Sequence, residues 1–273
     1  MPTTDGPVRI IGHWGQMDDA ARSDATRRGL DKIFDPALRQ GICELIEDVR
    51  QHGDEAVARA LKKFDGCDVA PGGLRVTEEE SQRARRQISP ELLAAIRDGI
   101  DHVRRFNEQV VARGDWDFES EPGLTVGEKV TPIVSAGLFV PSGKGSYPSV
   151  LVQLGTPAVV AGVPTIAVVV PPVPGSPGDV DPAVLVVADE LGLTDVFRVN
   201  GPAGVAALAF GTETIPKVRK VVGPGSPAVT CAQVEVQRYG TVTTMLLGPS
   251  ERDRKSTRLN SSHQSSSRMP SSA

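Results

Sequence analysis

The stretch TIAVVVPPVPGSPGDVDPAVLVVADELGLTDVFRVNGPAG, residues 165–204, decides the fold class of this chain. It opens with an apolar, β-branched run and continues through a loop rich in proline and glycine (171–181). A helix-compatible stretch (182–192) and a second apolar run, DVFRV (195–199), follow. A strand, a helix and a second strand at this spacing are typical of a βαβ unit in a parallel sheet. Because the apolar runs are continuous rather than alternating, we expect strands that are covered on both faces.

The same pattern extends to either side of that stretch. Upstream, GLFVP (137–141) predicts a strand and residues 149–161 a helix; downstream, residues 203–210 predict a helix and VRKVV (218–222) a strand. Ligands of open α/β sheets bind outside the carboxyl ends of the strands. The candidate binding region therefore consists of three glycine-containing loops, which are VPSGKGSYPS (140–149), VNGPAG (199–204) and VGPGSPAVT (222–230).

The N-terminal half, residues 36–113, has a helical period instead. Apolar residues recur there at spacings of three and four, as in Ile42, Leu45, Ile46 and Val49. Thr77 and Glu80 have the spacing of a capping box, and Ser89 followed by Pro90 is a typical helix start. These stretches have apolar stripes and charged backs, so we expect them to pack against the sheet and to carry no chemistry of their own.

The glycine-rich loops are compatible with nucleotide binding but do not establish it. A helix that starts after glycine directs free N–H groups at an anion such as a pyrophosphate. SGKGSYPS (142–149) is not a dinucleotide-binding fingerprint, because Pro148 stands at the third glycine position. It is not a P-loop either, because Gly145 follows Lys144 where Ser or Thr would hold magnesium. Nucleotide binding and ordinary turns stay open as alternatives.

Other titratable groups form no recognisable catalytic or metal site. The three cysteines are widely spaced, which favours neither a disulfide framework nor a metal site. His13, His52 and His102 are scattered, and we expect them at the surface. The neighbouring carboxylates Asp189 and Glu190 are predicted to lie on a solvated helix face.

Composition and charge narrow the class of partner. The net charge of −4 does not favour nucleic acid or an anionic membrane as a partner. The first 16 residues lack the pattern of a secretory signal, and Pro157 and Pro164 interrupt the most apolar window, residues 149–170. We therefore expect a cytoplasmic protein with no membrane and no nucleic-acid partner.

Five stretches resemble histidinol dehydrogenases, in order and at matching spacing. They are HGDEAVARALKKFDG (52–66), RVTEEESQRARRQISPELLAAI (75–96), AGLFVPSGKGSYPS (136–149), AALAFGTETIPKVRKVVGPG (206–225) and GPSE (248–251). The resemblance covers residues 36–251. It implies an α/β fold with an N-terminal helical region followed by a Rossmann-like parallel-sheet module, which is an incomplete histidinol dehydrogenase-like fold.

The resemblance also implies an activity. Histidinol dehydrogenases are zinc-dependent homodimers that oxidise a small-molecule amino alcohol, L-histidinol, through the aldehyde to L-histidine with two NAD+. By position, Phe139 and Ser226 correspond to cofactor-binding residues of the family and Ser250 to a substrate-binding serine. The family's zinc ligands and acid/base pair are expected beyond GPSE. No metal ligand or catalytic residue is therefore assigned in this chain.

Two positions depart from the family pattern. Ser226 stands where the family has a cofactor-contacting Asn, and Ala203 stands where it has a cofactor-contacting Gln. Both departures remove an amide group. They favour a paralogue that oxidises another polar alcohol, such as sulfopropanediol. A third hypothesis is a non-catalytic nucleotide-binding fragment.

The sequence divides into three regions. Residues 1–129 are expected to form a helical arm and part of a first module, and residues 130–251 the Rossmann-like cofactor-binding module. Residues 252–273 hold eight serines and five basic residues without a helix or strand period. We interpret this segment as a disordered, non-native tail that resembles translated sequencing-adapter sequence; the alternative is a basic, phosphorylatable tail. On this interpretation the family sequence is truncated after Glu251.

Overall fold

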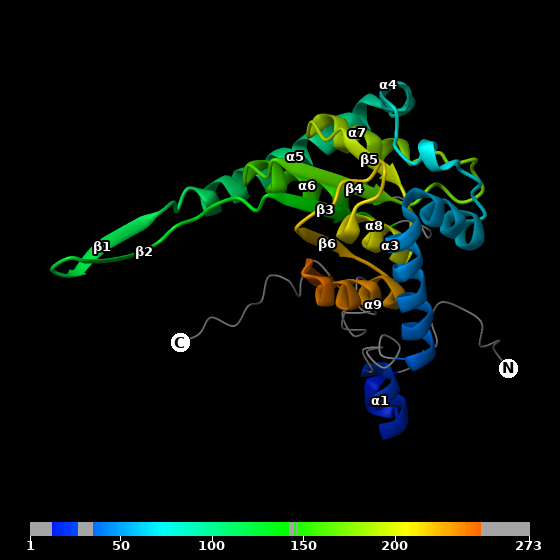
Figure 1. Cartoon of the computed structure of the whole chain (residues 1–273), viewed down its shortest axis with the longest axis horizontal. Helices are drawn as coiled ribbons and strands as arrows, with labels where there is room; N and C mark the ends of the chain where they lie inside the picture. Colours follow the sequence, from blue (N-terminus) through cyan, green and yellow to red (C-terminus); the bar gives the residue numbers. More distant parts are fainter. Residues whose placement is uncertain (1–12, 27–34, 142–144, 146, 247–273) are drawn as a thin grey trace.

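The computed structural model describes residues 13–26, 35–141, 145 and 147–246, which form an α/β structure around a five-stranded sheet (Figure 1). All neighbouring strands of this sheet run parallel. In chain order they are β3 (Ser135–Phe139), β4 (Thr165–Val170), β5 (Asp195–Arg198), β6 (Lys220–Pro224) and β7 (Val242–Leu246). The predicted parallel sheet is confirmed.

The order of the strands creates a switch point between β3 and β6. In space the strands lie in the order β5-β4-β3-β6-β7. The chain thus builds outward from β3 through β4 to β5, and then returns to the other side of β3 with β6 and β7. In open α/β sheets the crevice at the carboxyl ends of the strands that flank such a reversal is the usual ligand site.

Helices cover both faces of the sheet. One face, which includes Phe139, Val169 and Phe197, packs under α3 (Pro36–Asp65), α8 (Gly201–Phe210) and α9 (Pro227–Val236). The other face, which includes Leu138, Val140 and Val168, packs under α4 (Glu78–Gln87), α5 (Pro90–Val111), α6 (Pro148–Val160) and α7 (Pro182–Glu190). Adjacent strand residues point to opposite faces, so both must be apolar when both faces are covered. This explains the continuous apolar runs.

The predicted helical region 36–113 is confirmed as α3, α4 and α5. The capping box at the start of α4 is present, with the Thr77 N–H donating to Glu80 Oε2 at 2.8 Å and the Glu80 N–H donating to Thr77 Oγ at 3.3 Å. Ser89 caps α5, where its hydroxyl accepts from the Leu92 N–H. A short helix, α1 (Asp19–Thr26), and three 3₁₀ turns, which are η1 (Trp14–Gln16), η2 (Pro71–Gly73) and η3 (Gln237–Tyr239), complete the described helices. None of the described helices has both the length and the hydropathy needed to cross a bilayer.

The prediction of a solvated acidic face on α7 is wrong for Glu190. Its side chain is only 14% exposed and lies between two arginines, at 2.6 Å from Arg85 and 2.8 Å from Arg97. These arginines come from α4 and α5, so Glu190 ties both helices to α7. Asp189 also pairs with Arg85 but is about half exposed. The adjacent pair looked equivalent in the sequence because the arginines lie about a hundred residues earlier.

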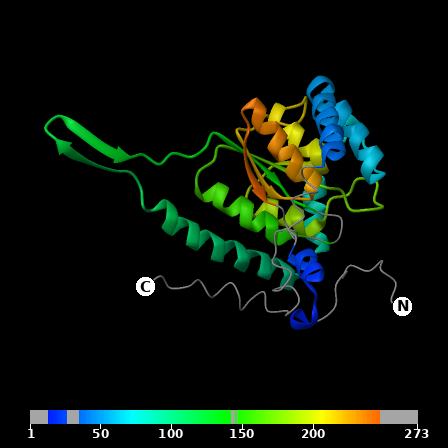
Figure 2. The ribbon, with the colours of Figure 1, turned by 90° about the horizontal axis from the view of Figure 1, so that it is seen from below.

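A second, separate sheet consists of a single antiparallel hairpin, β1 (Trp116–Glu121) and β2 (Leu124–Glu128). It follows α5 and projects away from the rest of the structure in both Figure 1 and Figure 2. The hairpin, α9 and β7 are missing from the elements that the sequence predicts above. In the hairpin, apolar and polar residues alternate on either side of Pro122 and Gly123, so the sequence does carry the period-2 signal of two strands joined by a turn.

Candidate functional site

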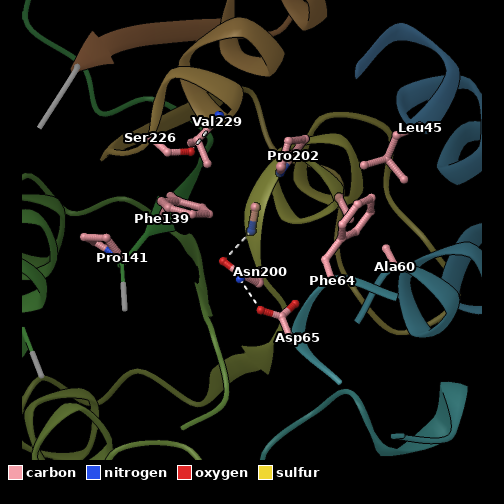
Figure 3. Close-up of a pocket in the computed structure, with 12 residues that line it drawn as sticks. Leu45, Ala60, Phe64, Asp65, Phe139, Pro141, Asn200, Pro202, Ser226 and Val229 are labelled. Atoms are coloured by element: carbon pink, nitrogen blue, oxygen red, sulfur yellow. Dashed lines mark hydrogen bonds between the residues drawn. The ribbon is translucent and has the colours of Figure 1, made fainter. Parts of the chain in front are cut away.

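A cavity of about 310 Å³ opens at the carboxyl ends of β3, β5 and β6, next to the switch point (Figure 3). Its volume falls at the lower end of the range of about 300–1,000 Å³ that is usual for small-molecule sites. The loops that follow β3, β5 and β6 each contribute to it, and the end of α3 closes it. The lining residues are Leu45, Ala60, Phe64, Asp65, Phe139, Pro141, Asn200, Gly201, Pro202, Ala203, Ser226 and Val229.

Phe139 is held rigidly at the edge of this cavity. It is the last residue of β3 and is 2% exposed. Gly223 of β6 lies so close that a Cβ at that position would collide with the Phe139 carbonyl oxygen. Figure 3 shows Phe139, Pro141 and Ser226 together at one end of the cavity, with Phe64 and Ala60 at the other. The cavity therefore has an aromatic ring at each end.

Two helices begin at the cavity. Asn200 caps α8 and Ser226 caps α9, where the Ser226 hydroxyl oxygen accepts from the Val229 N–H at 3.4 Å. A helix start carries a partial positive charge and favours anions. The Ser226 hydroxyl keeps its own O–H as a donor for a ligand, because capping uses only an acceptor lone pair. Ala203 lies in the first turn of α8 and is 3% exposed.

A carboxylate and an amide meet on the same wall. Asn200 donates from its side-chain nitrogen to the Asp65 carboxylate and accepts at Oδ1 from the Gly201 N–H. Burial raises the pKa of the Asp65 carboxyl, and the hydrogen bond from Asn200 opposes that rise. A partly buried carboxylate in a cavity is an acceptor for ligand donors and a marker of functional sites.

The structure brings together two of the three site residues that the sequence predicts. Phe139 and Ser226 line the same cavity, and Ala203, the second departure from the family pattern, lines it as well. Ser250 lies outside the described residues, as do residues 142–144 and 146 of the first glycine-rich loop. His13, His52 and His102 are exposed, as expected, and do not line the cavity.

Sequence reasoning missed Asp65 and Asn200. The signals were present in the KFDG part of the 52–66 motif and in the NGPAG loop. The two residues are separated by 135 positions, and only the packing of α3 over the sheet joins them. No local pattern reports such a contact.

The described side chains do not fit the zinc ion that the resemblance implies. Among them no three His, Cys, Asp or Glu groups lie close enough together to hold a metal ion. Cys43, Cys67 and Cys231 are free, and burial raises the pKa of each thiol. A raised pKa disfavours the thiolate that a metal requires. We therefore derive no step through zinc.

A family model and individual relatives of known family both match this chain. The family model for histidinol dehydrogenase matches residues 31–252. A histidinol dehydrogenase homolog of Rhizobium meliloti (strain 1021) is 42% identical over 211 residues, which is 77% of this chain and 45% of the relative. Histidinol dehydrogenase of Bacillus subtilis (strain 168) is 39% identical over 233 residues, which is 84% of this chain and 53% of the relative.

A solved structure agrees with the fold. The crystal structure of histidinol dehydrogenase from Elizabethkingia anophelis superposes with a TM-score of 0.72 at 29% identity, covering 78% of this chain and 48% of that one. The chain spans about half the length of the relatives it matches. The family model covers most of this chain, including every residue that lines the cavity. The chain therefore belongs to the histidinol dehydrogenase family.

Proposed function

We propose that this chain supplies the NAD-binding part of a histidinol dehydrogenase-type oxidoreductase, which oxidises L-histidinol through the aldehyde to L-histidine. One observation carries the proposal: the cavity at the switch point gathers Phe139, Ala203 and Ser226, three positions at which the family resemblance implies cofactor contacts. A homodimer, which the resemblance implies, and a cytoplasmic location belong to the same proposal.

The cavity has the chemical groups that a nicotinamide dinucleotide requires. Phe64, 64% exposed, offers a flat apolar surface for one of its rings, and the starts of α8 and α9 offer partial positive charge for its phosphates. Asp65 offers an acceptor for a ribose hydroxyl. The volume of about 310 Å³ suits one ring and its ribose rather than the whole cofactor.

The contribution of these residues to the reaction is binding and placement. Bound NAD+ supplies the chemistry by accepting a hydride from the alcohol carbon. Phe139 and Pro141 would fix the plane of the ring and exclude water from one side, and the Ser226 O–H would hold a polar group of the cofactor. No general acid or base is assigned among the described residues, so we derive no proton-transfer step.

Calorimetric titration of the 273-residue chain with NAD+ tests the proposal. We expect saturable binding that the Phe64→Ala variant weakens by at least about tenfold, because Phe64 lines the cavity and, at 64% exposed, presents its ring to a ligand. Phe106→Ala is the matched control, since Phe106 is 70% exposed on α5 and does not line the cavity. No binding by the unmodified chain, or equal loss in both variants, would contradict the proposal.

A second candidate is a paralogue that oxidises another polar alcohol, such as sulfopropanediol. Ala203 and Ser226 favour it, because both cavity positions lack the amide group of the family pattern. The test is an activity assay of the full-length gene product. The rates at which it oxidises histidinol and sulfopropanediol are compared by following NADH absorbance. Ordinary turnover of histidinol would reject the paralogue. NAD+ binding without turnover of either alcohol would instead support a non-catalytic nucleotide-binding protein.

A further inference from the structure

The β1–β2 hairpin has one apolar face and one acidic face. In its register Trp116 lies opposite Glu128 and Phe118 lies opposite Val126, and directly opposed residues share a face. Because strand residues alternate between faces, Leu124 shares the face of Val126. The apolar face thus consists of Trp116, Phe118, Leu124 and Val126, with Glu128 at its end accepting from the Trp116 indole N–H at 3.1 Å; the acidic face consists of Asp117 and Glu119 with Thr125 and Gly127.

The apolar face is uncovered. Its four large side chains are exposed by 52%, 54%, 51% and 38%, in chain order. Trp116 and Phe118 stack on one another with 6.3 Å between ring centroids, which covers only a small part of either ring. An isolated two-stranded hairpin is marginally stable in water, and a contiguous apolar patch usually marks an interaction site.

The end of α5 extends this uncovered apolar surface. The first half of α5 packs against the body through Ile96 and Ile100, which are buried. Its second half carries Phe106, 70% exposed, and Val110, 46% exposed, one helical turn apart. Figures 1 and 2 both show this half of α5 leading outward to the hairpin. Helix end and hairpin together form one arm whose large apolar side chains are between 38% and 70% exposed.

The lengths of the relatives indicate what covers the arm. The family model spans residues 31–252, a range that includes the hairpin. The matched stretch is only 45% of the Rhizobium meliloti relative and 53% of the Bacillus subtilis relative. The five-stranded sheet already has helices of this chain on both faces. The arm is therefore a large apolar surface that is available to the other half of a full-length relative.

We propose that the apolar face of the hairpin docks the half of the histidinol dehydrogenase polypeptide that this chain does not match. The docked half would add strands to a hairpin edge and pack apolar side chains on Trp116 and Phe118. Both outer edges of the hairpin are unpaired among the described strands, so either can accept a strand. A second copy of this chain is disfavoured at the β1 edge. Pairing β1 with another β1 would place Asp117, Glu119 and Glu121 opposite like charges.

Hydrogen exchange on the hairpin amides, residues 116–128, tests this proposal. The chain is measured alone and co-expressed with the unmatched half of the Bacillus subtilis relative. A third sample is a fusion of residues 1–246 to the unmatched half of the Bacillus subtilis relative. The fusion allows the same measurement if the separate half is insoluble. We expect fast exchange in the chain alone, and exchange slowed by at least about tenfold in the complex and in the fusion.

Variants distinguish the apolar face from the acidic face. Phe118→Ser with Val126→Ser removes apolar contacts and should abolish the protection and the co-purification of the two halves. Asp117→Ser with Glu119→Ser is the matched control on the opposite face and should preserve both. All four side chains are exposed, so circular dichroism should show an unchanged body in both variants.

Three results would overturn the proposal. The first is an unprotected hairpin in the fusion protein. The second is equal association of the apolar-face variant and the acidic-face variant. The third is sedimentation of the 273-residue chain alone as a dimer that Phe118→Ser with Val126→Ser dissociates, which would assign the face to a second copy.

Discussion

The backbone N–H of Asp54 donates a hydrogen bond of 2.8 Å to the Glu213 carboxylate, across 159 positions of sequence. Gly53 has φ +49° and interrupts α3, so the helix restarts at Asp54 with free N–H groups. Glu213 therefore acts as an N-cap supplied from the loop after α8, and this hydrogen bond lowers its pKa. The Thr212 hydroxyl donates a hydrogen bond to the Asp54 carboxylate. The GDEA and GTE motifs are thus two halves of one structural contact.

Replacement of Glu213 by Ala should lower the free energy of unfolding by about 1 kcal/mol, because a helix start loses its capping acceptor. Urea unfolding followed by circular dichroism measures the change. Glu55→Ala is the matched control: its side chain is 75% exposed and its pair with Arg59 spans 3.9 Å. We expect Glu55→Ala to lower the free energy of unfolding by less than about 0.5 kcal/mol. Equal effects of the two variants would show that Glu213 is not a cap.

Two glycine-to-alanine changes in long helices should have opposite signs. Gly53→Ala should destabilise the chain by more than about 1 kcal/mol, because φ is positive there and a Cβ would collide with the Glu213 carboxylate. Gly99→Ala in α5 should stabilise it by about 0.5–1 kcal/mol, since nothing lies within 4 Å of a Cβ there. Melting temperatures provide the comparison. A stabilising Gly53→Ala would refute the positive-φ helix break.

Stability should depend on pH through Glu190. The hydrogen bond from Arg97 lowers the pKa of Glu190, burial opposes this, and Arg85 lowers it further. A carboxyl with a lowered pKa stabilises the folded state above its unfolded pKa of about 4.3 and loses that contribution as the pH falls through the folded pKa. Glu190→Gln should therefore lower the free energy of unfolding by about 1 kcal/mol at pH 7. The difference from the unmodified chain should become progressively smaller below about pH 4.3.

The measurement for this prediction is urea unfolding of both proteins from pH 3 to pH 7. Asp98→Asn is the control, since Asp98 is 73% exposed and lies on the same helix as Arg97. A difference between Glu190→Gln and the unmodified chain that does not change with pH would exclude the ionised carboxylate as its cause.

Most of the sheet could be predicted from the sequence because its strands are buried on both faces. β3, β4 and β5 lie within one or two residues of the predicted runs. β6 begins two residues late, because Val218 packs under α8 and its N–H donates to the Leu208 carbonyl oxygen instead of a neighbouring strand. The division of the chain near residue 130 stays a prediction.

The site could be predicted only in part. Phe139 and Ser226 follow from motif positions, and their convergence in one cavity required the strand order. Asp65 and Glu190 are carboxylates whose partners lie on other elements, so their burial and charge have no local signature. The hairpin was missed for a different reason: Trp116 and Phe118 alternate with Asp117 and Glu119, a strand signal that was present in the sequence and was not used.

Asp65 should select NAD+ over NADP+, on the basis of the proposed cofactor site. A carboxylate that accepts from a ribose hydroxyl is repelled by a 2′-phosphate. Asp65→Asn should therefore weaken NAD+ binding by about tenfold, equivalent to about 1.4 kcal/mol, and reduce the preference for NAD+ over NADP+. Calorimetric titration with both dinucleotides measures this. Asp68→Asn is the control, because its side chain is 75% exposed and pairs with Lys62 outside the cavity.

The Asp65→Asn variant also distinguishes an effect on NAD+ binding from an effect on the stability of the folded chain. Burial raises the pKa of Asp65, so the folded state favours the protonated form, and its contribution to stability is lost as the pH rises above about 3.9. Asp65→Asn should then be no less stable than the unmodified chain at pH 7, since an amide can still accept from Asn200 without carrying a buried charge. Weaker NAD+ binding in an equally stable protein would locate the effect in the cavity. An unchanged preference between the two dinucleotides would remove Asp65 from the proposed ribose contact.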